Sequence, residues 1–268
     1  MPLLSPILPP DDCIVELTGV SKIFARGITA LEGFDLRVAR GEFLSLLGPS
    51  GCGKSTALRL IAGLLEPSSG TVSWAGSGSQ KQSGENGLGF VFQDATLMPW
   101  ANATANVALP LKLAGIDKAL RNARAIEALE RVGLGGFAQA YPRELSGGMR
   151  MRVSIARALV TQPRVLLMDE PFAALDEITR FKLNDDLLAL WQSLGMTIVF
   201  VTHSVFESAY LSSRVAVMTP RPGRIFADLP LDMSRLRDAR FRTSADYAVD
   251  CRRVSQALAA ATGETIAA

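Results

Sequence analysis

The chain has 268 residues, of which 48% are hydrophobic and 20% charged, and its 28 basic and 26 acidic side chains give a formal net charge of +2. These proportions are typical of a globular protein with a large apolar core, and they exclude a disordered or fibrous chain. The near balance of charge argues against a dedicated nucleic-acid binder, which usually carries a basic excess on one face. The length is compatible with one lobed domain or with two domains.

The N-terminal sequence and the cysteines indicate the cellular compartment in which the protein is expected to work. Residues 1–12, MPLLSPILPPDD, lack a basic start and are rich in proline, so we expect an N-terminal extension there and no signal peptide. No apolar run is long enough to span a bilayer, so any link to a membrane is expected to come through a partner. Cys13, Cys52 and Cys251 are far apart, which predicts neither disulfides nor a metal site and fits a reducing cytosol.

The first part of the chain alternates apolar, β-rich runs with a helical stretch, which is typical of an α/β fold. Strands are predicted at residues 14–20, 33–38, 43–47, 70–74 and 88–92, and a helix is predicted from about residue 54 to 63. The run at 43–47 is wholly apolar, as in a strand that is buried on both faces. The polar, glycine-rich stretch at 76–87 predicts a surface loop.

Strand signals disappear between about residues 104 and 141, and the run at 117–132 predicts a strong helix. We therefore expect a helical subdomain at about 103–160, inserted into the α/β core, with a further helix from about 148 to 160. Beyond it we expect buried strands at 164–168 and 197–201, a long helix at 177–194, and a β-pair at 215–219 and 224–229. The tail from Asp232 is predicted to be helical. The core domain would then span residues 13–230, followed by a C-terminal helical extension at 231–268.

The motif GPSGCGKST at residues 48–56 follows an apolar strand and opens a helix, as a phosphate-binding loop does. Its glycines let the backbone form a nest whose N–H groups face phosphate, and the helix N-terminus adds partial positive charge. Lys54 is expected to reach the β- and γ-phosphates, the Ser55 hydroxyl to bind Mg²⁺, and Thr56 to support the α-phosphate side. The sequence therefore predicts that ATP binds at Gly48, Pro49, Ser50, Gly51, Cys52, Gly53, Lys54, Ser55 and Thr56.

Two adjacent carboxylates follow the predicted buried strand at 164–168. Asp169 is expected to hold the Mg²⁺ shell, commonly through water, and Glu170 to polarise the attacking water. Two acids at a strand end are also compatible with a solvated turn. The phosphate loop elsewhere in the chain favours the catalytic interpretation.

LSGGM at residues 145–149, followed by RMRVSIARAL, resembles the signature of the ATP-binding cassette (ABC) ATPases, although the family usually has Gln where this chain has Met149. Ser146, Gly147 and Gly148 precede a predicted helix and form a second anion-binding site. The alternative is an ordinary helix start with a serine N-cap. The resemblance implies a P-loop ABC-type α/β fold with an antiparallel β subdomain and an inserted helical subdomain. It also implies that two chains pair head to tail, so that each signature caps the ATP held by the other chain.

Four more positions match the family, and together the motifs occur in its order over about residues 14–229. The resemblance makes Gln93 the glutamine that touches Mg²⁺ or the water and relays the nucleotide state to the helical lobe. It makes His203 the histidine on the γ-phosphate and Asp176 a contact to the opposite subunit's site. It makes Phe24 the aromatic ring that stacks on adenine, although a lone histidine or phenylalanine is more often structural.

Within the family, the stretches PFAALDEITR, LMPWANATANVALPL and VAVMTPRPGRI resemble the nitrate/sulfonate/taurine importers of bacteria. This resemblance implies a homodimer on two permease subunits at the cytoplasmic face of the inner membrane. A periplasmic or lipid-anchored solute-binding protein would act on it indirectly, and no nucleic acid is expected. The alternative is a soluble cassette ATPase that acts on nucleic acid or protein complexes without a permease.

Overall fold

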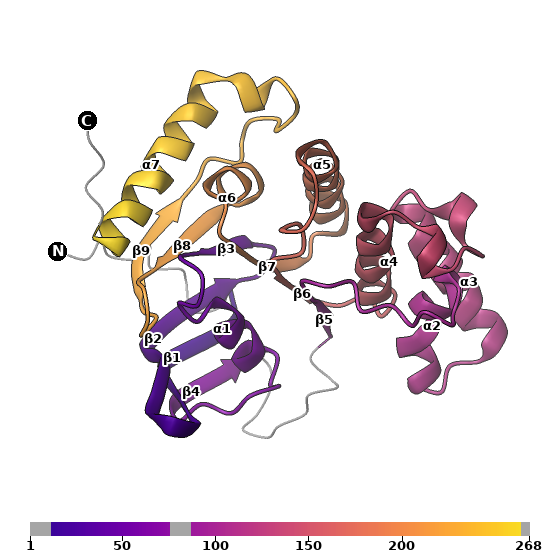
Figure 1. Ribbon diagram of the computed structural model, residues 1–268, viewed down its shortest axis with the longest axis horizontal. Coiled ribbons are helices and arrows are strands. Elements are labelled where there is room, and N and C mark those ends of the chain that lie inside the picture. The colour runs from indigo at the N-terminus through magenta and orange to yellow at the C-terminus, as the bar shows by residue number, and fades with distance from the viewer. Residues whose placement is uncertain (1–11, 76–86, 264–268) are drawn as a thin grey trace. The chain divides into compact units, whose positions relative to one another are not determined.

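The computed structural model describes residues 12–75 and 87–263 (Figure 1). The chain divides into two compact units. Unit 1 comprises Met1–Ser83 and Thr197–Ala268, and unit 2 comprises Gly84–Met196. Apart from Asp12 and Gly87, the predicted N-terminal extension and the predicted polar loop lie outside the described residues.

Unit 1 contains a three-stranded antiparallel sheet with the strand order β2-β1-β4. Its strands are β1 (Cys13–Phe24), β2 (Ile28–Ala39) and β4 (Ser69–Trp74), with a 3₁₀ turn, Ala25–Gly27, between β1 and β2. The predicted ranges cover only parts of β1 and β2. Register shifts after Val20 and Lys22 break the alternation of buried and exposed side chains. The halves of β1 and β2 next to the turn that joins them therefore lack the alternating pattern by which a strand is predicted.

A second sheet in unit 1 has the order β7-β3-β8-β9, formed by β3 (Phe43–Leu47), β7 (Thr197–Thr202), β8 (Arg214–Met218) and β9 (Ile225–Pro230). Strands β7, β3 and β8 are parallel, and β9 runs antiparallel to β8. Every residue of β3, β7 and β8 is buried, which the sequence had predicted for β3 and β7. Helix α1 (Lys54–Ile61) begins after the loop that follows β3 and packs against β7. The predicted phosphate loop therefore lies at the carboxyl end of a central parallel strand, where α/β folds bind ligands.

Helix α6 (Val205–Leu211) was not predicted from the sequence. A local sequence pattern marks the start of this helix. Ser204 is the N-cap, and its hydroxyl accepts a hydrogen bond of 3.3 Å from the Glu207 N–H. Ser-x-x-Glu is the pattern of a capping box. Ser204 stands where the ABC family often has Asp, and both residues are good N-caps.

The prediction that the tail is helical from Asp232 was wrong as far as residue 244, apart from a 3₁₀ turn at Phe241–Thr243. The Asp232 and Asp238 carboxylates accept hydrogen bonds from backbone N–H groups two or three residues ahead, and such local turns compete with a helix. Helix α7 (Ala245–Thr262) begins only at the Ser244 N-cap. It lies along β8 and β9 and buries Val254 against a cluster that includes Leu47 and Leu229 (Figure 1).

Unit 2 combines a parallel pair, β5 (Leu88–Val91) and β6 (Val165–Asp169), with helices α2 (Ala103–Leu113), α3 (Lys118–Arg131), α4 (Gly147–Leu159) and α5 (Glu177–Leu194). Short 3₁₀ turns occur at Gly135–Phe137 and Pro142–Glu144. Helices α2, α3 and α4 pack on one another, and α4 also contacts α5. The predicted helix at 117–132 is α3 with Asp117 as its N-cap, and the predicted helix at 177–194 is α5. Gly195 ends α5 with φ 60°, a conformation that glycine adopts without strain.

Candidate functional site

The loop between β3 and α1 has a backbone that only glycine accommodates at its critical turn. Gly53 is the N-cap of α1 and has φ 110°. A Cβ at this position would lie 2.7 Å from Leu31 Cδ2 and 2.8 Å from the Ala30 carbonyl oxygen. Both the φ angle and the close approach therefore require glycine at position 53, where the loop packs against β2.

Lys54 is folded into this loop. Its side chain is buried, and its Nζ donates hydrogen bonds of 2.8 Å to the Gly48 carbonyl and 3.0 Å to the Pro49 carbonyl. Ser55 and Thr56 follow in the first turn of α1 and are half-buried. No acidic residue occupies that first turn, so the positive end of the helix dipole is not offset locally. The loop thus joins a cation, a helix N-terminus and a glycine backbone, which is the chemistry that binds phosphate.

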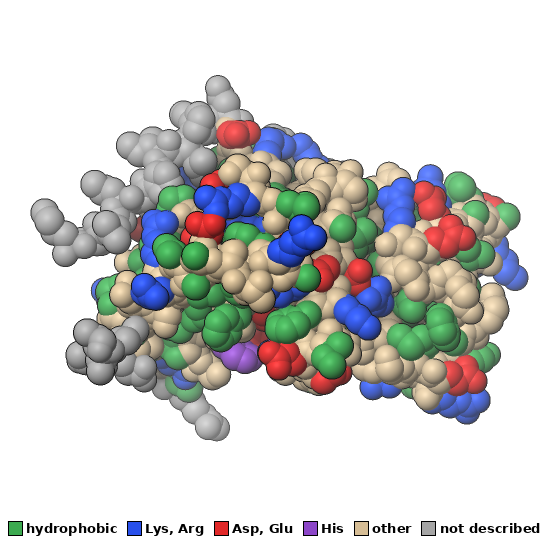
Figure 2. Space-filling view, turned by 90° about the horizontal axis from the view of Figure 1, so that it is seen from above, with side chains coloured by type: hydrophobic (Ala, Val, Ile, Leu, Met, Phe, Trp, Pro, Cys, Tyr) green, Lys and Arg blue, Asp and Glu red, His purple; other side chains and the backbone are tan. Residues whose placement is uncertain are grey.

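Two further predicted residues of unit 1 are exposed. His203, the only histidine of the chain, directly follows β7 and is the purple side chain in Figure 2. Phe24 ends β1 with 39% of its surface exposed, and the Lys22 Nζ lies 5.5 Å from its ring centroid. Both side chains are accessible to a ligand, as their predicted roles require.

The acidic pair of unit 2 combines burial with backbone strain. Asp169 is the last residue of β6 and is only 7% exposed. Glu170 follows with φ 45°, which is uncommon for a residue other than glycine. Strained backbone of this kind tends to occur at functional sites, because it fixes a side chain in a direction that a relaxed turn would not give.

The signature residues lie at the start of α4. Ser146 is the N-cap, and its hydroxyl accepts a hydrogen bond of 3.3 Å from the Met149 N–H. A Cβ at Gly148 would lie 2.6 Å from Thr179 Cγ2, and one at Gly147 would lie 3.3 Å from Leu175 Cδ2. The glycines therefore let the start of α4 pack closely on the start of α5.

Asp176 belongs to the same neighbourhood, because it is the N-cap of α5. Its carboxylate accepts a hydrogen bond of 2.9 Å from the Thr179 N–H, and this bond holds the pKa of Asp176 below its ordinary value. The structure thus places Ser146, Gly147 and Gly148 beside the segment that contains Asp176. Both Ser146 and Asp176 also act as ordinary helix caps.

Gln93 is exposed just after β5, and the segment behind it is tied to α4 by a residue that sequence reasoning missed. Arg157 donates hydrogen bonds of 2.9 Å to the carbonyl oxygens of Ala95 and Thr96 and one of 3.0 Å to Thr96 Oγ1. Burial lowers the pKa of the Arg157 guanidinium. Within RMRVSIARAL this arginine resembles a solvated helix residue, so only the tertiary contact reveals that it joins the Gln93 segment to the signature helix.

The expected Mg²⁺ is compatible with the residues present. Among residues 12–75 and 87–263, no group of three or more His, Cys, Asp or Glu side chains could cage a metal ion. Ser55 in unit 1 and Gln93 and Asp169 in unit 2 each carry a side-chain oxygen donor. Oxygen donors suit Mg²⁺, which keeps several waters and is usually bound through few protein groups and substrate phosphates.

Two sequence-based exclusions can also be compared with the described residues. Cys13, Cys52 and Cys251 form no disulfide bond among the described residues. None of the described helices is both long enough and apolar enough to cross a membrane.

The fold and the loop define a P-loop nucleotide-binding protein, and comparison with known proteins specifies the family. Residues 31–173 match the family model ABC_tran, ABC transporter. An uncharacterized ABC transporter ATP-binding protein of Methanocaldococcus jannaschii, MJ0412, is 47% identical over 234 residues, which cover 87% of this chain and 86% of that protein. The taurine import ATP-binding protein TauB of Rhizobium johnstonii is 46% identical over 212 residues, which cover 79% of this chain and 80% of TauB.

A solved structure gives the same result. The dimeric post-hydrolysis state of the ATP-binding cassette MJ0796, bound to ADP and Pi, matches with a TM-score of 0.72 and 34% identity over 82% of this chain and 99% of that chain. The chain therefore belongs to the ABC transporter family, as an ATP-binding subunit that hydrolyses ATP in transport.

Proposed function

We propose that this chain is the ATP-hydrolysing subunit of an importer for a small anionic or zwitterionic solute of the nitrate/sulfonate/taurine type. The single observation that carries the ATP site is Lys54 folded into a glycine loop at a helix N-terminus, within hydrogen-bond distance of Gly48 and Pro49. The importer assignment is supported by the 46% identity to the taurine import protein TauB.

Binding of ATP would use the whole loop from Gly48 to Thr56. The backbone N–H groups and Lys54 contact the phosphates, and Phe24 stacks on the adenine. The Ser146, Gly147 and Gly148 segment of a second copy completes the site from the other side, because an exposed helix N-terminus is a ready anion-binding group. Asp176 contacts the site of the opposite copy. Each ATP is therefore shared by two chains that pair head to tail.

Hydrolysis would use a base and positive charge rather than a covalent intermediate. Glu170 accepts a proton from the attacking water, while Lys54 and His203 stabilise the charge on the γ-phosphate. Ser55, Gln93 and Asp169 would hold Mg²⁺, which would supply positive charge to the phosphates. Gln93 would relay the nucleotide state to the helical subdomain.

The nucleotide-driven closure of two copies would be transmitted to two permease subunits at the cytoplasmic face of the membrane. A solute-binding protein on the other side would deliver the solute. A strain that lacks this chain, grown on taurine, an alkanesulfonate or nitrate as the sole source of sulfur or nitrogen, tests the importer assignment. Loss of growth on one of these solutes is expected, and normal growth on all of them contradicts it.

The catalytic assignment is tested by Glu170→Gln, with Glu177→Gln as the matched control, because Glu177 is an exposed acid in the first turn of α5. ATP turnover of Glu170→Gln is expected to fall by more than about 100-fold, the scale of a lost general base. With excess ATP and Mg²⁺ a dimer should accumulate on size-exclusion chromatography. Unchanged turnover in Glu170→Gln would remove Glu170 from this role.

A further inference from the structure

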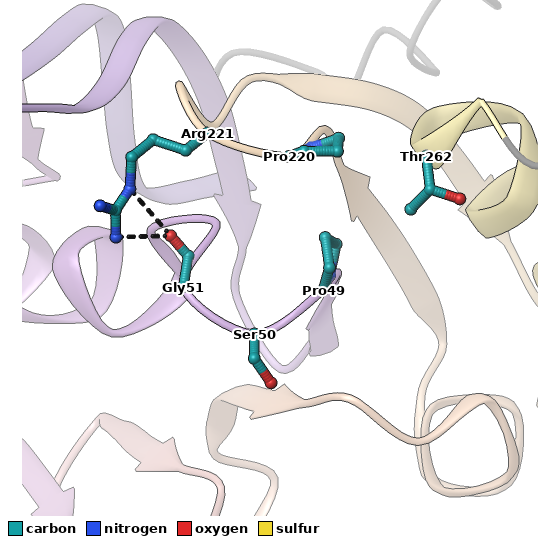
Figure 3. A pocket seen from close by; sticks show the side chains of 6 residues that line it. All are labelled: Pro49, Ser50, Gly51, Pro220, Arg221 and Thr262. Atoms are coloured by element: carbon teal, nitrogen blue, oxygen red, sulfur yellow. Dashed lines mark hydrogen bonds between the residues drawn. The ribbon is translucent and has the colours of Figure 1, made fainter.

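The turn between β8 and β9, residues 219–224 (TPRPGR), contacts the phosphate loop from the outside. Arg221 Nε and Nη2 donate hydrogen bonds of 3.1 and 2.9 Å to the same acceptor, the Gly51 carbonyl oxygen (Figure 3). Arg221 therefore clamps one carbonyl group at the tip of the loop.

A second contact of the same turn lies one peptide further along the loop. A Cβ at Gly223 would lie 2.1 Å from the Cys52 carbonyl oxygen, so only glycine permits this approach. The Gly223 N–H donates a hydrogen bond of 2.9 Å to the Ala30 carbonyl, and the Gly223 carbonyl accepts one of 3.2 Å from the Glu32 N–H. The turn is thus fixed to β2 and approaches two consecutive carbonyl groups of the phosphate loop, those of Gly51 and Cys52.

The direction of these carbonyls decides the direction of the N–H groups. In a trans peptide the C=O of one residue and the N–H of the next point in opposite directions. Because the Gly51 carbonyl is held outward by Arg221, the Cys52 N–H faces the loop interior, where it donates a 3.3 Å hydrogen bond to the Pro49 carbonyl that Lys54 also contacts.

The charge of Arg221 adds to this geometric effect. A guanidinium that donates to a carbonyl polarises the whole peptide group, which makes the N–H at its other end a stronger donor. The Cys52 N–H is the donor that becomes stronger. An anion in the loop would therefore meet a stronger hydrogen-bond donor than a peptide group without the Arg221 contact offers.

We propose that Arg221 is a positioning residue of the ATP site, which holds the Gly51 peptide so that the Cys52 N–H faces the loop interior, where the nucleotide phosphates would bind. This inference rests on the proposed function, in which the loop from Gly48 to Thr56 binds ATP. Arg221 itself contacts the loop and not the substrate.

The test compares Arg221→Met and Arg221→Lys with Arg224→Met and Lys54→Ala. Arg224 belongs to the same turn but forms an exposed ion pair with Glu32, so its replacement perturbs the hairpin without touching the phosphate loop. The dissociation constants of Mg-ADP and Mg-ATP are measured by titration, together with KM and kcat for ATP. The melting temperature of each variant shows whether it is folded.

Arg221→Met is expected to raise both dissociation constants and KM about fivefold and to leave kcat within about twofold, because a pre-organised binding contact is lost and no reacting group. Arg221→Lys should recover part of the affinity, since an ammonium can still donate to the Gly51 carbonyl. Arg224→Met should bind nucleotide as the natural protein does. If Arg221→Met fails to fold, Arg221→Lys is compared with Arg224→Met in the same way, and weaker binding by the lysine variant alone is the expected result.

Two results overturn the proposal: nucleotide affinity within twofold of the natural protein in Arg221→Met, or an equal loss in Arg224→Met, which would make the effect one of hairpin stability. Lys54→Ala separates this failure from failure of the proposed function. Loss of nucleotide binding in Lys54→Ala with normal binding in Arg221→Met refutes only the positioning role of Arg221. Normal binding in Lys54→Ala refutes the ATP site at this loop.

Discussion

Arg214 lies at the centre of a buried ion network that secures the sheet from which the phosphate loop emerges. It lies on β8 with its side chain 7% exposed, and its Nη1 is 2.8 Å from Glu42 Oε1. Its Nε is 2.8 Å from Asp228 Oδ1 on β9, and its Nη2 donates a hydrogen bond of 2.6 Å to the Arg37 carbonyl. Replacement by Met keeps most of the apolar volume but leaves two buried carboxylates without their cation. We therefore predict that Arg214→Met strongly destabilises unit 1.

The expected loss of unfolding free energy is about 3–5 kcal/mol, the range for removing one partner of a buried pair. For a protein of this size that loss corresponds to a fall in Tm of roughly 10 °C. The matched control is Arg224→Met, which breaks a pair whose side chains are 56% and 49% exposed. An exposed pair contributes about 0–1 kcal/mol, so this variant should melt close to the natural protein.

The loss in Arg214→Met should also depend on pH. Burial raises the pKa of Glu42 above its ordinary value of 4.5, even though the charge of Arg214 acts in the opposite direction. A raised folded-state pKa means that the Glu42 contribution to stability is fully present below 4.5 and is lost as the pH rises through the folded-state pKa. Removing Arg214 removes a lowering influence, so the variant's deficit should be larger at pH 8 than at pH 5. Urea denaturation at both pH values measures it. A deficit no larger than that of Arg224→Met, or one independent of pH, would refute the reasoning.

Three further substitutions test unit 2. Arg157→Met should lower kcat for ATP and leave the nucleotide dissociation constant nearly unchanged, because the Arg157 guanidinium secures the loop after β5. A fall in nucleotide affinity as large as the fall in kcat would contradict this role. Gly148→Ala should lower ATPase activity, since the new methyl group would lie 2.6 Å from Thr179 Cγ2, and adding Thr179→Ser should restore activity by removing that atom. Failure of this rescue would show that the steric explanation is wrong. Asp117→Ala should lower the Tm in thermal denaturation, because Asp117 is the N-cap of α3, and an unchanged Tm would count against the cap.

The sequence predicted those parts of the fold whose cause is local. β3 and α5 are bounded by residues that start or stop an element, such as the Asp176 N-cap and Gly195, so their limits could be predicted closely. The glycine loop was predictable for the same reason. Helix α6 had a local signal in Ser204 and Glu207 that the prediction overlooked.

Other features depend on contacts between distant parts of the chain and leave no pattern in the sequence. Arg221 and Gly51 are 170 residues apart, and Arg157 is 62 residues from Ala95. Both arginines resemble solvated surface residues until their acceptors are known. The two arginines, which hold the loops after β3 and β5, were therefore not among the predicted site residues.

The central claim is that a second copy completes each ATP site, and mixing two inactive variants tests it most directly. Lys54→Ala disables the phosphate loop, and Ser146→Arg disables the signature, so each variant alone should lack ATPase activity. A head-to-tail pair of the two contains one site with both lesions and one intact site. The account predicts that the mixture regains ATPase activity with excess ATP and Mg²⁺. A mixture as inactive as its components, although mixed dimers form, would contradict the account.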